Sequence, residues 1–439
     1  MKETTAGRLE RMQAEKAKKM FLGGEGVERI TALLSCSREA AADESRRIVR
    51  LIEEFETRFG ADRDVKIFRA PGRTEICGNH TDHQGGRVLA AGINLDALAV
   101  VSLTGGTEIR VKSVGFPEDC VQADDTNPRP DEEGTSAALV RGLCAGLAAK
   151  GFRAEGFCAC TENQVLPGSG LSSSAAFEVL LGTAMNHLFC GGFLTPLETA
   201  QLAQYAENRY FGKPCGLMDQ AASAVGGFVL LDFSEADNPR AEKIPFDFSS
   251  CGYRLCIIDT KGSHSGLTQD YATIPAEMKK VAACFGKTLL SQVDEEEFYS
   301  RLPEVRATAG DRAALRAMHF FAENRRVVRE AEALRTREFP TFLRLVMESG
   351  HSSFEFLQNA YPPSRTKEQG IPVALALCSR LLAKRGGAWR LHGGGFAGTV
   401  QAYVPNEYFE EFSREIEAVF GRGSCLPLSV CAAGGVQIL

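Results

Sequence analysis

The chain has 439 residues, of which 44% are hydrophobic and 24% charged, and its formal net charge is −6. This composition excludes a mostly disordered or collagen-like chain, and the lack of a Lys/Arg-rich tract disfavours a nucleic-acid partner. No apolar run approaches the roughly 18 residues of a membrane span, and the N-terminal segment lacks the apolar core of a secretory signal. We therefore expect a cytoplasmic protein of two or three domains, with no membrane and no nucleic-acid partner.

The 14 cysteines are scattered and form no Cys-x-x-Cys pair. In a reducing compartment, scattered cysteines are typical of small buried hydrophobic positions. A structural zinc site or a disulfide framework is therefore disfavoured.

The N-terminal part of the chain predicts helix first and then a strand-rich region. Residues 1–45 are charged and predict a helical extension. Apolar residues then recur at helical spacing and predict a helix that packs against the rest of the protein; they are Ile48, Leu51, Ile52, Phe55 and Phe59. Further along, we expect strands at 65–68, 97–103 and 157–161, an exposed acidic and Pro-rich loop at 115–134, and a helix at 135–150.

The second half mixes the same elements in a different order. We expect strands at 228–232 and 255–259, a mostly helical region at 270–360, and two strands around a glycine turn at 386–404. The polar segment 234–250 contains Pro239 and Pro245 and is a candidate domain boundary. Because strands and helices do not alternate regularly, the fold is predicted as α+β or α/β rather than as a doubly wound sheet.

A Gly- and Ser-rich turn at 167–174 leads into an apolar helix that starts near Ser174. Glycines let the backbone approach an anion, and the free N–H groups of a helix N-terminus favour phosphate. The three serines could cap the helix or offer hydroxyls to phosphate or Mg²⁺. The segment is not a Walker A loop, because no Lys-Ser/Thr pair follows its last glycine; a capped helix without a ligand is the alternative.

Residues 69–83 concentrate polar side chains between two predicted strands. Hydroxyl groups of a sugar need donors and acceptors at fixed positions, which such a segment can supply. A solvated hairpin loop is the alternative, and a zinc site is disfavoured because no further cluster completes the ligands. The side chains concerned are Arg73, Asn79, His80, Asp82 and His83.

Two further segments carry weaker signals. The triple glycine at 393–395 precedes an alternating strand and indicates a tight turn or a close approach to a ligand. The stretch 207–220 holds two candidate carboxylates, Glu207 for Mg²⁺ and Asp219 for proton abstraction. Either residue alone is more often a surface charge or a helix cap.

Together these segments resemble the GHMP kinase superfamily and, within it, the galactokinases. Arg-Ala-Pro-Gly-Arg at 69–73 with Gly-Asn-His-Thr-Asp at 78–82 resembles the galactokinase signature Gly-Arg-x-Asn-Leu-Ile-Gly-Glu-His-Thr-Asp. Pro-Gly-Ser-Gly-Leu-Ser-Ser-Ser-Ala-Ala at 167–176 resembles the phosphate loop of the superfamily. Cys-Gly-Leu-Met-Asp-Gln at 215–220 and Gly-Gly-Gly-Phe-Ala-Gly at 393–398 follow in family order.

The resemblance implies an ATP-dependent sugar-1-kinase that phosphorylates the anomeric hydroxyl of galactose or a similar sugar, with ATP and Mg²⁺. It implies a ribosomal-S5-like N-terminal lobe and a ferredoxin-like C-terminal lobe. The predicted divisions are a helical extension (1–45), an N-terminal lobe (46–240) and a C-terminal lobe (241–439). A protein partner is not indicated.

By the same resemblance, Asp219 is the general base and Arg73 lies beside it, which suits phosphoryl transfer. The implied sugar-binding residues are Asn79, His80, Asp82, Gly216 and Tyr271. The implied ATP-binding residues are Pro167, Gly168, Ser169, Gly170, Leu171, Ser172, Ser173, Ser174 and Ala175, with Gly394 and Gly395. The implied Mg²⁺ ligands are Ser173 or Ser174 together with Glu207.

The first motif departs from the signature. Asn79 stands where glutamate is usual, and the segment from Thr74 to Cys77 differs from Asn-Leu-Ile. We expect Asn79→Glu to improve the use of galactose if galactose is a poor substrate. The alternatives are a kinase for another sugar such as N-acetylgalactosamine, another GHMP kinase, or a kinase-like sugar and ATP sensor that acts through a protein partner. The intact serines and Asp219 argue against the sensor.

Overall fold

The computed structural model describes residues 12–165, 170–235, 238–263 and 266–439. Its larger sheet has the strand order β12-β1-β2-β5-β3-β4, with β6 paired to β2 and β7 paired to β6. The strands of this sheet are β1 (Lys66–Cys77), β2 (Arg87–Leu103), β3 (Glu108–Ser113), β4 (Glu118–Gln122), β5 (Phe157–Asn163), β6 (Phe228–Asp232), β7 (Arg240–Ile244) and β12 (Val436–Gln437).

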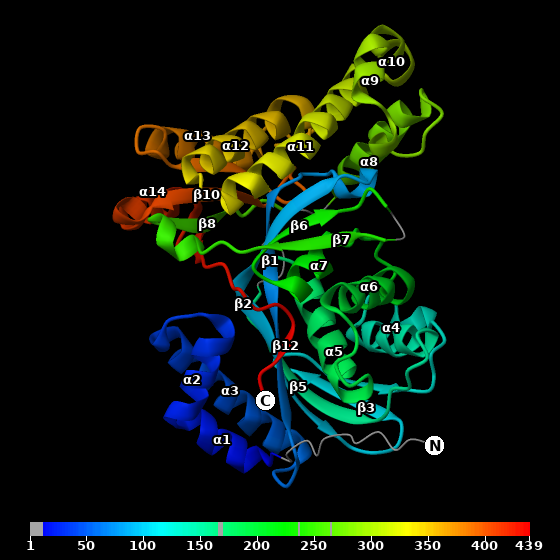
Figure 1. Ribbon diagram of the computed structural model, residues 1–439, viewed down its shortest axis with the longest axis vertical. Helices are drawn as coiled ribbons and strands as arrows, with labels where there is room; N and C mark the ends of the chain where they lie inside the picture. The colour runs from blue at the N-terminus through cyan, green and yellow to red at the C-terminus, as the bar shows by residue number, and fades with distance from the viewer. Residues whose placement is uncertain (1–11, 166–169, 236–237, 264–265) are drawn as a thin grey trace.

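A second, four-stranded sheet is built from the C-terminal half and is antiparallel throughout, in the order β11-β8-β10-β9. It lies at the upper left of Figure 1, beside α13 and α14. Its strands are β8 (Tyr253–Asp259), β9 (Ala388–His392), β10 (Thr399–Pro405) and β11 (Cys425–Leu428).

The larger sheet is buried on both faces, and β2 shows how the sequence achieves this. Successive strand residues point to opposite faces. Leu98 and Val100 therefore enter the core beneath the N-terminal helices. Ala97, Ala99 and Val101 enter the core on the other face. This accounts for the continuous apolar run at 97–103, which a half-exposed strand would not carry.

The N-terminal helices cover one face of this sheet and a second group covers the other (Figure 1). The first group is α1 (Ala14–Leu22), α2 (Gly24–Leu34) and α3 (Arg38–Phe59); the second is α4 (Ser136–Ala149), α5 (Ser173–Phe189), α6 (Pro196–Ala206) and α7 (Met218–Val225). The five apolar residues expected on a packing helix are all buried in α3. That prediction is confirmed.

The region predicted as mostly helical is confirmed and forms the upper part of Figure 1. Its helices are α8 (Thr268–Ala283), α9 (Glu295–Ser300), α10 (Leu302–Ala309), α11 (Asp311–Arg335) and α12 (Phe339–Ser352), followed later in the chain by α13 (Gly370–Leu382) and α14 (Phe409–Phe420). Helices α13 and α14 pack on the second sheet. The mixed, two-sheet architecture confirms the predicted α+β fold class.

Two local predictions need correction. The strand predicted at 65–68 does not end at Phe68, because β1 continues through Pro71 and Gly72 to Cys77 with a shift of register between Pro71 and Arg73. A bulge of this kind accommodates a proline that cannot donate to the ladder. The predicted loop at 115–134 contains strand β4. The polar segment 234–250 contains strand β7, so the larger sheet extends to Ile244 and the second sheet begins at Tyr253.

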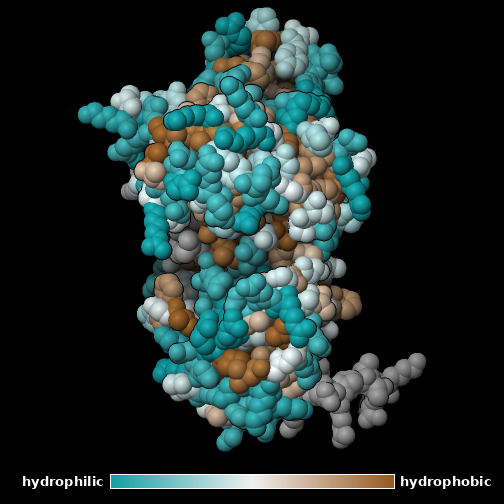
Figure 2. Space-filling model, turned by 90° about the vertical axis from the view of Figure 1, so that its left-hand side faces the viewer, coloured by the Kyte–Doolittle hydropathy of each residue, from teal (hydrophilic) through white to brown (hydrophobic). Residues whose placement is uncertain are grey.

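Figure 2 shows a surface dominated by hydrophilic residues, with separate small hydrophobic areas. Scattered exposed apolar residues are normal for a folded domain. Within the residues that the structure describes, no helix has both the length and the apolar character needed to cross a bilayer.

Candidate active site

Arg73 and Asp219 form a bidentate ion pair between β1 and the first turn of α7. Arg73 Nε lies 2.7 Å from Asp219 Oδ1, and Arg73 Nη2 lies 2.5 Å from Asp219 Oδ2. The Ser172 hydroxyl donates to Asp219 Oδ2 at 2.6 Å. The fork geometry fixes both the position and the orientation of the carboxylate. The structure therefore brings together the two residues predicted to be catalytic.

The charge state of Asp219 follows from two opposing effects. Burial alone would raise its pKa, but the Arg73 charge and the Ser172 hydrogen bond outweigh burial and hold the pKa below its ordinary value. The side chain keeps 29% of its surface exposed, against 9% for Arg73. An ionised and reachable carboxylate can accept a proton from a bound hydroxyl group.

The N-terminus of α5 faces this pair through Ser172. Ser172 has φ 60°, so it occupies the left-handed region that a non-glycine residue rarely adopts. Its hydroxyl bonds to Asp219 and does not cap the helix. The first N–H groups of α5 thus have no side-chain cap, which suits an anion. Of the predicted phosphate loop, Pro167, Gly168 and Ser169 lie outside the described residues.

Two further residues of this loop, Gly170 and Leu171, contact Arg73. Gly170 O accepts from Arg73 Nη1, and Leu171 O accepts from the Arg73 backbone N–H at 3.1 Å. Ala175 is buried in the first turn of α5. The loop and the catalytic pair are therefore one connected unit.

Glu207 lies at the end of α6, where its carboxylate is buried beside the third serine of the run. Ser174 Oγ lies 3.4 Å from Glu207 Oε1, Lys213 Nζ lies 2.9 Å from the same oxygen, and Gln220 Nε2 lies 2.7 Å from Oε2. Ser173 instead lies beside Asn163, which donates to its Oγ at 3.1 Å. Between the two predicted serines, the geometry favours Ser174 as the partner of Glu207.

These oxygen atoms fit Mg²⁺, which is usually held by one or two protein oxygens together with substrate phosphates. Among the described residues, no three His, Cys, Asp or Glu side chains gather as a metal cage would require.

Asp82 and Gly216 meet on the other side of the candidate site. A Cβ atom at Gly216 would stand 2.3 Å from Asp82 Oδ2, so a larger residue at this position would displace the carboxylate. Burial raises the pKa of Asp82 to about 6, and the charge of Asp219 acts in the same direction. At neutral pH, Asp82 is still largely ionised and can accept hydrogen bonds from hydroxyl groups.

We expect Gly216→Ala to displace the Asp82 carboxylate and to raise the KM for the sugar about tenfold or more, with little change in the KM for ATP. The reason is steric, because the added methyl group and Oδ2 cannot both keep their places. Steady-state kinetics with each substrate varied in turn would measure this. Gly24→Ala is the matched control, since a Cβ there meets nothing within 4 Å; equal sugar KM values in both variants would contradict the assignment.

Three predicted sugar residues surround the glycine turn that follows β9. Asn79 Nδ2 donates to Gly393 O at 2.6 Å, His80 Nε2 lies 3.0 Å from Gly394 O, and Tyr271 Oη donates to Gly395 O at 2.7 Å. Since a carbonyl only accepts, His80 carries its proton on Nε2. Burial lowers the pKa of His80 to about 4, so it is neutral at physiological pH. The predicted sugar residues and the turn of Gly394 and Gly395 are therefore in direct contact.

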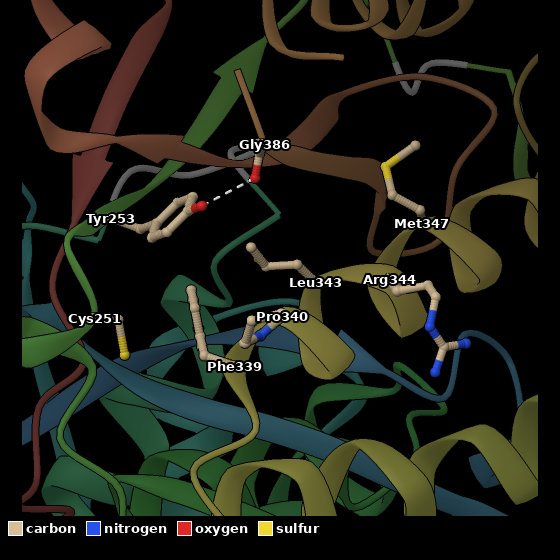
Figure 3. A pocket seen from close by; sticks show the side chains of 9 residues that line it. Cys251, Tyr253, Phe339, Pro340, Leu343, Arg344, Met347 and Gly386 are labelled. Atoms are coloured by element: carbon tan, nitrogen blue, oxygen red, sulfur yellow. Dashed lines mark hydrogen bonds between the residues drawn. The ribbon is translucent and has the colours of Figure 1, made fainter. Parts of the chain in front are cut away.

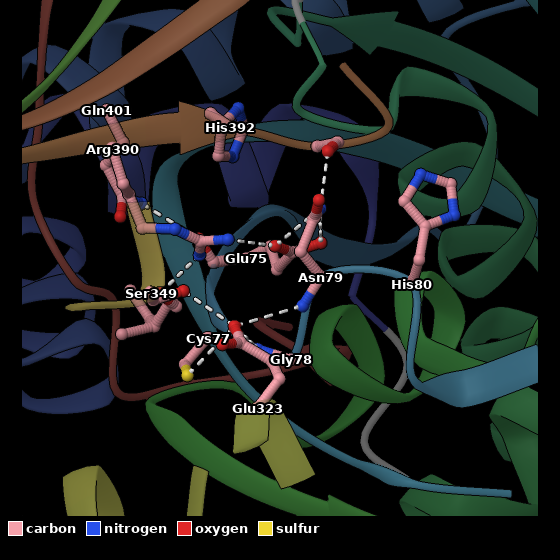
Figure 4. Close-up of polar contacts among 12 residues, drawn as sticks. Glu75, Cys77, Gly78, Asn79, His80, Glu323, Ser349, Arg390, His392 and Gln401 are labelled. Atoms are coloured by element: carbon pink, nitrogen blue, oxygen red, sulfur yellow. Dashed lines mark hydrogen bonds and ion pairs between the residues drawn. The ribbon is translucent and has the colours of Figure 1, made fainter. Parts of the chain in front are cut away.

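A buried polar cluster supports this region, and the sequence did not reveal it (Figure 4). Glu323 Oε1 accepts from the backbone N–H groups of Gly78 at 3.0 Å and Asn79 at 3.4 Å, and from the Ser349 hydroxyl at 2.6 Å. His319 Nε2 donates to Asn79 O at 2.9 Å. The spacing of His319 and Glu323 on α11 places both on one helix face. This spacing was the only signal in the sequence, and it does not indicate which loop His319 and Glu323 contact.

The Glu323 carboxylate is stable as an anion inside this cluster. Burial alone would raise its pKa, but the neighbouring His319, Arg326 and Arg390 outweigh burial and lower the pKa to about 2. A permanently charged acceptor beneath the backbone of Gly78 and Asn79 fixes the loop that carries His80 and Asp82.

A separate cavity of about 510 Å³ lies between β8 and α12 (Figure 3). None of its lining side chains belongs to the candidate site. Its lining residues are Cys251, Tyr253, Phe339, Pro340, Leu343, Arg344, Met347, Gly386 and Gly387.

Comparisons with known proteins agree with this geometry. Residues 53–103 match the galactokinase galactose-binding signature, and residues 137–227 match the GHMP kinases N terminal domain. Galactokinase of Streptomyces coelicolor is 31% identical over 373 residues, covering 84% of this chain and 92% of that protein. Galactokinase of Glaesserella parasuis is 31% identical over 395 residues, covering 88% of this chain and 98% of that protein.

Solved structures show the same fold. A crystal structure of Lactococcus lactis galactokinase complexed with galactose has a TM-score of 0.76 at 23% identity, covering 89% of this chain and 99% of that chain. A mevalonate kinase structure has a TM-score of 0.58 at 16% identity, covering 83% of this chain and 99% of that chain. With relatives at this identity and coverage, the chain belongs to the galactokinase family of the GHMP kinase superfamily.

Proposed function

We propose that this protein transfers the γ-phosphoryl group of ATP to the anomeric hydroxyl of galactose or a closely similar sugar. The observation that carries the proposal is the bidentate Arg73–Asp219 pair, in which an ionised and partly exposed carboxylate accepts a hydrogen bond from Ser172, the residue immediately before α5. Membership of the galactokinase family supports the choice of sugar.

In the proposed reaction, Asp219 accepts the proton of the anomeric hydroxyl of the sugar. At the same time, the oxygen of that hydroxyl forms a bond to the γ-phosphorus of ATP. The bond from that phosphorus to the β,γ-bridging oxygen breaks, and ADP leaves with the electron pair. Arg73 keeps Asp219 ionised and places positive charge beside the transferring group, which is where charge develops in phosphoryl transfer. The uncapped N–H groups of α5 would bind phosphate oxygens.

The other site residues hold the reactants in place. Ser174 and Glu207 would hold Mg²⁺, which supplies charge neutralisation for the phosphates when bound. Asp82 would accept hydrogen bonds from ring hydroxyls, and Gly216 leaves room for its carboxylate. Positioning of this kind is a large part of catalysis in phosphoryl transfer, because the reaction needs little covalent assistance from the protein.

The test is ADP release with Mg-ATP across a panel of free sugars: galactose, N-acetylgalactosamine, glucose, arabinose and fucose. We expect galactose to give the highest kcat/KM. The product should carry its phosphate on C1, which ³¹P and ¹H NMR would identify. Sugar binding without ADP release for every sugar would contradict the proposed activity and favour a sensor.

A further inference from the structure

The side chain of Asn79 is held entirely by other protein groups. Asn79 is 0% exposed. Its Nδ2 lies 3.1 Å from Glu75 Oε1 and 3.3 Å from Glu75 Oε2, and it also donates to Gly393 O at 2.6 Å. Its Oδ1 accepts from Asn359 Nδ2 at 2.8 Å. Figure 4 shows the Asn79 side chain directed to the Glu75 carboxylate, with the His80 ring on a separate side of the loop.

The surroundings of position 79 require an amide. Two of its neighbours, the Glu75 carboxylate and Gly393 O, only accept hydrogen bonds, and the third, Asn359 Nδ2, only donates. Asparagine offers a donor and an acceptor at once, whereas a carboxylate would face two acceptors. An unmatched buried acceptor loses its hydrogen bond and the interaction with water as well.

Burial raises the pKa of Glu75, whereas the contact with Arg390 opposes this effect and favours the carboxylate. Arg390 Nη2 lies 2.8 Å from Glu75 Oε1, and both side chains are almost completely buried. Removing one partner of such a pair leaves an uncompensated charge. Glu75 therefore balances Arg390, and Asn79 is matched to Glu75. The galactokinase signature has the same two chemical groups in the opposite order, with asparagine at the place of Glu75 and glutamate at the place of Asn79.

Asn79 also fixes the glycine turn on which two other site residues rest. The carbonyls of Gly393, Gly394 and Gly395 accept from Asn79, His80 and Tyr271 in that order. Asn359 adds a second donor to Gly394 O at 3.1 Å. A turn held at three successive carbonyls has a fixed orientation, so it sets where the His80 and Tyr271 side chains lie.

We propose that Asn79 is a positioning residue, matched to the Glu75 carboxylate, which holds the Gly393–Gly395 turn in place for the sugar site and does not itself bind the sugar. This inference rests on the proposed function and assigns the specificity of the sugar site to the other residues of the loop. It changes the role expected for Asn79 from the sequence alone.

The first test is Asn79→Asp, which keeps the shape and removes the donor, assayed with galactose and its 2-, 3-, 4- and 6-deoxy analogues. A positioning residue affects all sugars alike, so kcat/KM should fall by one common factor of about tenfold to a hundredfold. If the loss disappears for one deoxy analogue only, Asn79 contacts that hydroxyl and the proposal is wrong.

The second test is the isosteric exchange Glu75→Gln/Asn79→Asp, which restores a donor between the two positions. Because Glu75→Gln also removes the charged partner of Arg390, the single variant Glu75→Gln is measured as well. We expect the double variant to lose clearly less in unfolding temperature and in kcat/KM than the two single losses combined. Losses that simply add would overturn the matching of the two residues. The coupling in thermal unfolding is measured without any sugar, so it tests the matching of the two residues even if the proposed function is wrong. Failure of the proposed function would be recognised separately, because the wild-type protein would then be inactive on every sugar.

Asn186→Asp is the matched control for folding. Asn186 is also buried, and its amide holds the backbone of Leu194 through contacts of 2.9 and 3.0 Å. We expect this control to lower the unfolding temperature without changing the sugar KM. An equal rise in sugar KM in Asn186→Asp and Asn79→Asp would reduce Asn79 to a general stability residue and overturn the proposal.

Discussion

Asp219→Asn is expected to lower kcat by about 10²- to 10⁴-fold, the usual contribution of a positioned general base. The substitution keeps the size of the side chain but removes its ability to take the proton of the sugar hydroxyl. Binding of ATP should change little, because Asp219 contacts Arg73 and Ser172 and its proposed role concerns the sugar hydroxyl. ADP release at saturating sugar measures the first effect, and calorimetric titration with ATP measures the second.

Asp232→Asn provides the matched control for this experiment. Asp232 also pairs with an arginine, with Arg87 Nε lying 2.7 Å from Asp232 Oδ2, but this pair joins β2 and β6 away from the glycine-serine loop. We expect the control to keep near wild-type kcat. If Asp219→Asn retained a kcat within about tenfold of wild type, Asp219 would not be the base.

The sequence predicted local structure well where a periodic apolar pattern was strong. The helix that carries Phe55 and the strand at 97–103 were both found, because burial on one or two faces leaves a distinct pattern. The continuation of β1 through Pro71 and Gly72 was missed, since these residues are the usual marks of a turn. Pairing with β2 overrides that local preference.

The proximity of Arg73 and Asp219 was predicted through family resemblance, because no local pattern relates the two residues. They are 146 residues apart. The supporting cluster could not be predicted in the same way. Glu323 and His319 meet the loop at Gly78 and Asn79 only after α11 packs against it. Contacts of this kind depend on tertiary packing rather than on local spacing.

The structure also reverses one expectation from the sequence. Asn79→Glu alone was expected to improve the use of galactose if galactose is a poor substrate, because it restores the residue of the signature. In the folded protein, a glutamate at this position would lie next to the Glu75 carboxylate and Gly393 O, both of which are acceptors. The single substitution should therefore impair the site, because a glutamate at position 79 needs the asparagine that the signature has at position 75.

Arg73→Met should also lower kcat by about 10²-fold or more at neutral pH, since it removes a charge placed where the phosphoryl group transfers. It should change the pH profile as well. In the wild type, Arg73 and Ser172 outweigh burial and keep the pKa of Asp219 low. Without Arg73, burial is the largest remaining effect and raises that pKa, so the acidic limb of the kcat profile should move to higher pH.

The same change predicts a weaker effect of acid on stability. A carboxyl group whose pKa is lowered by folding adds stability above its unfolded pKa and loses it as pH falls through the folded value. Without Arg73, the folded-state pKa of Asp219 is higher than in the wild type, so this carboxylate contributes less stability at neutral pH and less is lost on acidification. Thermal unfolding at several pH values between 3 and 8, roughly the range over which a carboxyl group titrates, should therefore show the Arg73→Met variant losing less stability on acidification than the wild type.

Two control variants identify the cause of these effects. Arg73→Lys separates the effect of the positive charge from that of the bidentate geometry, and Arg87→Met shows the effect of losing an ion pair elsewhere in the protein. Lysine keeps the positive charge but cannot make the two parallel bonds to Asp219, so its kcat should lie between those of the wild type and Arg73→Met, with a smaller shift of the acidic limb. Arg87→Met breaks the comparable pair with Asp232 and should leave the pH profile of kcat unchanged. An unshifted acidic limb in Arg73→Met would show that the ionisation of Asp219 does not depend on Arg73, and the proposed role of the pair would fail.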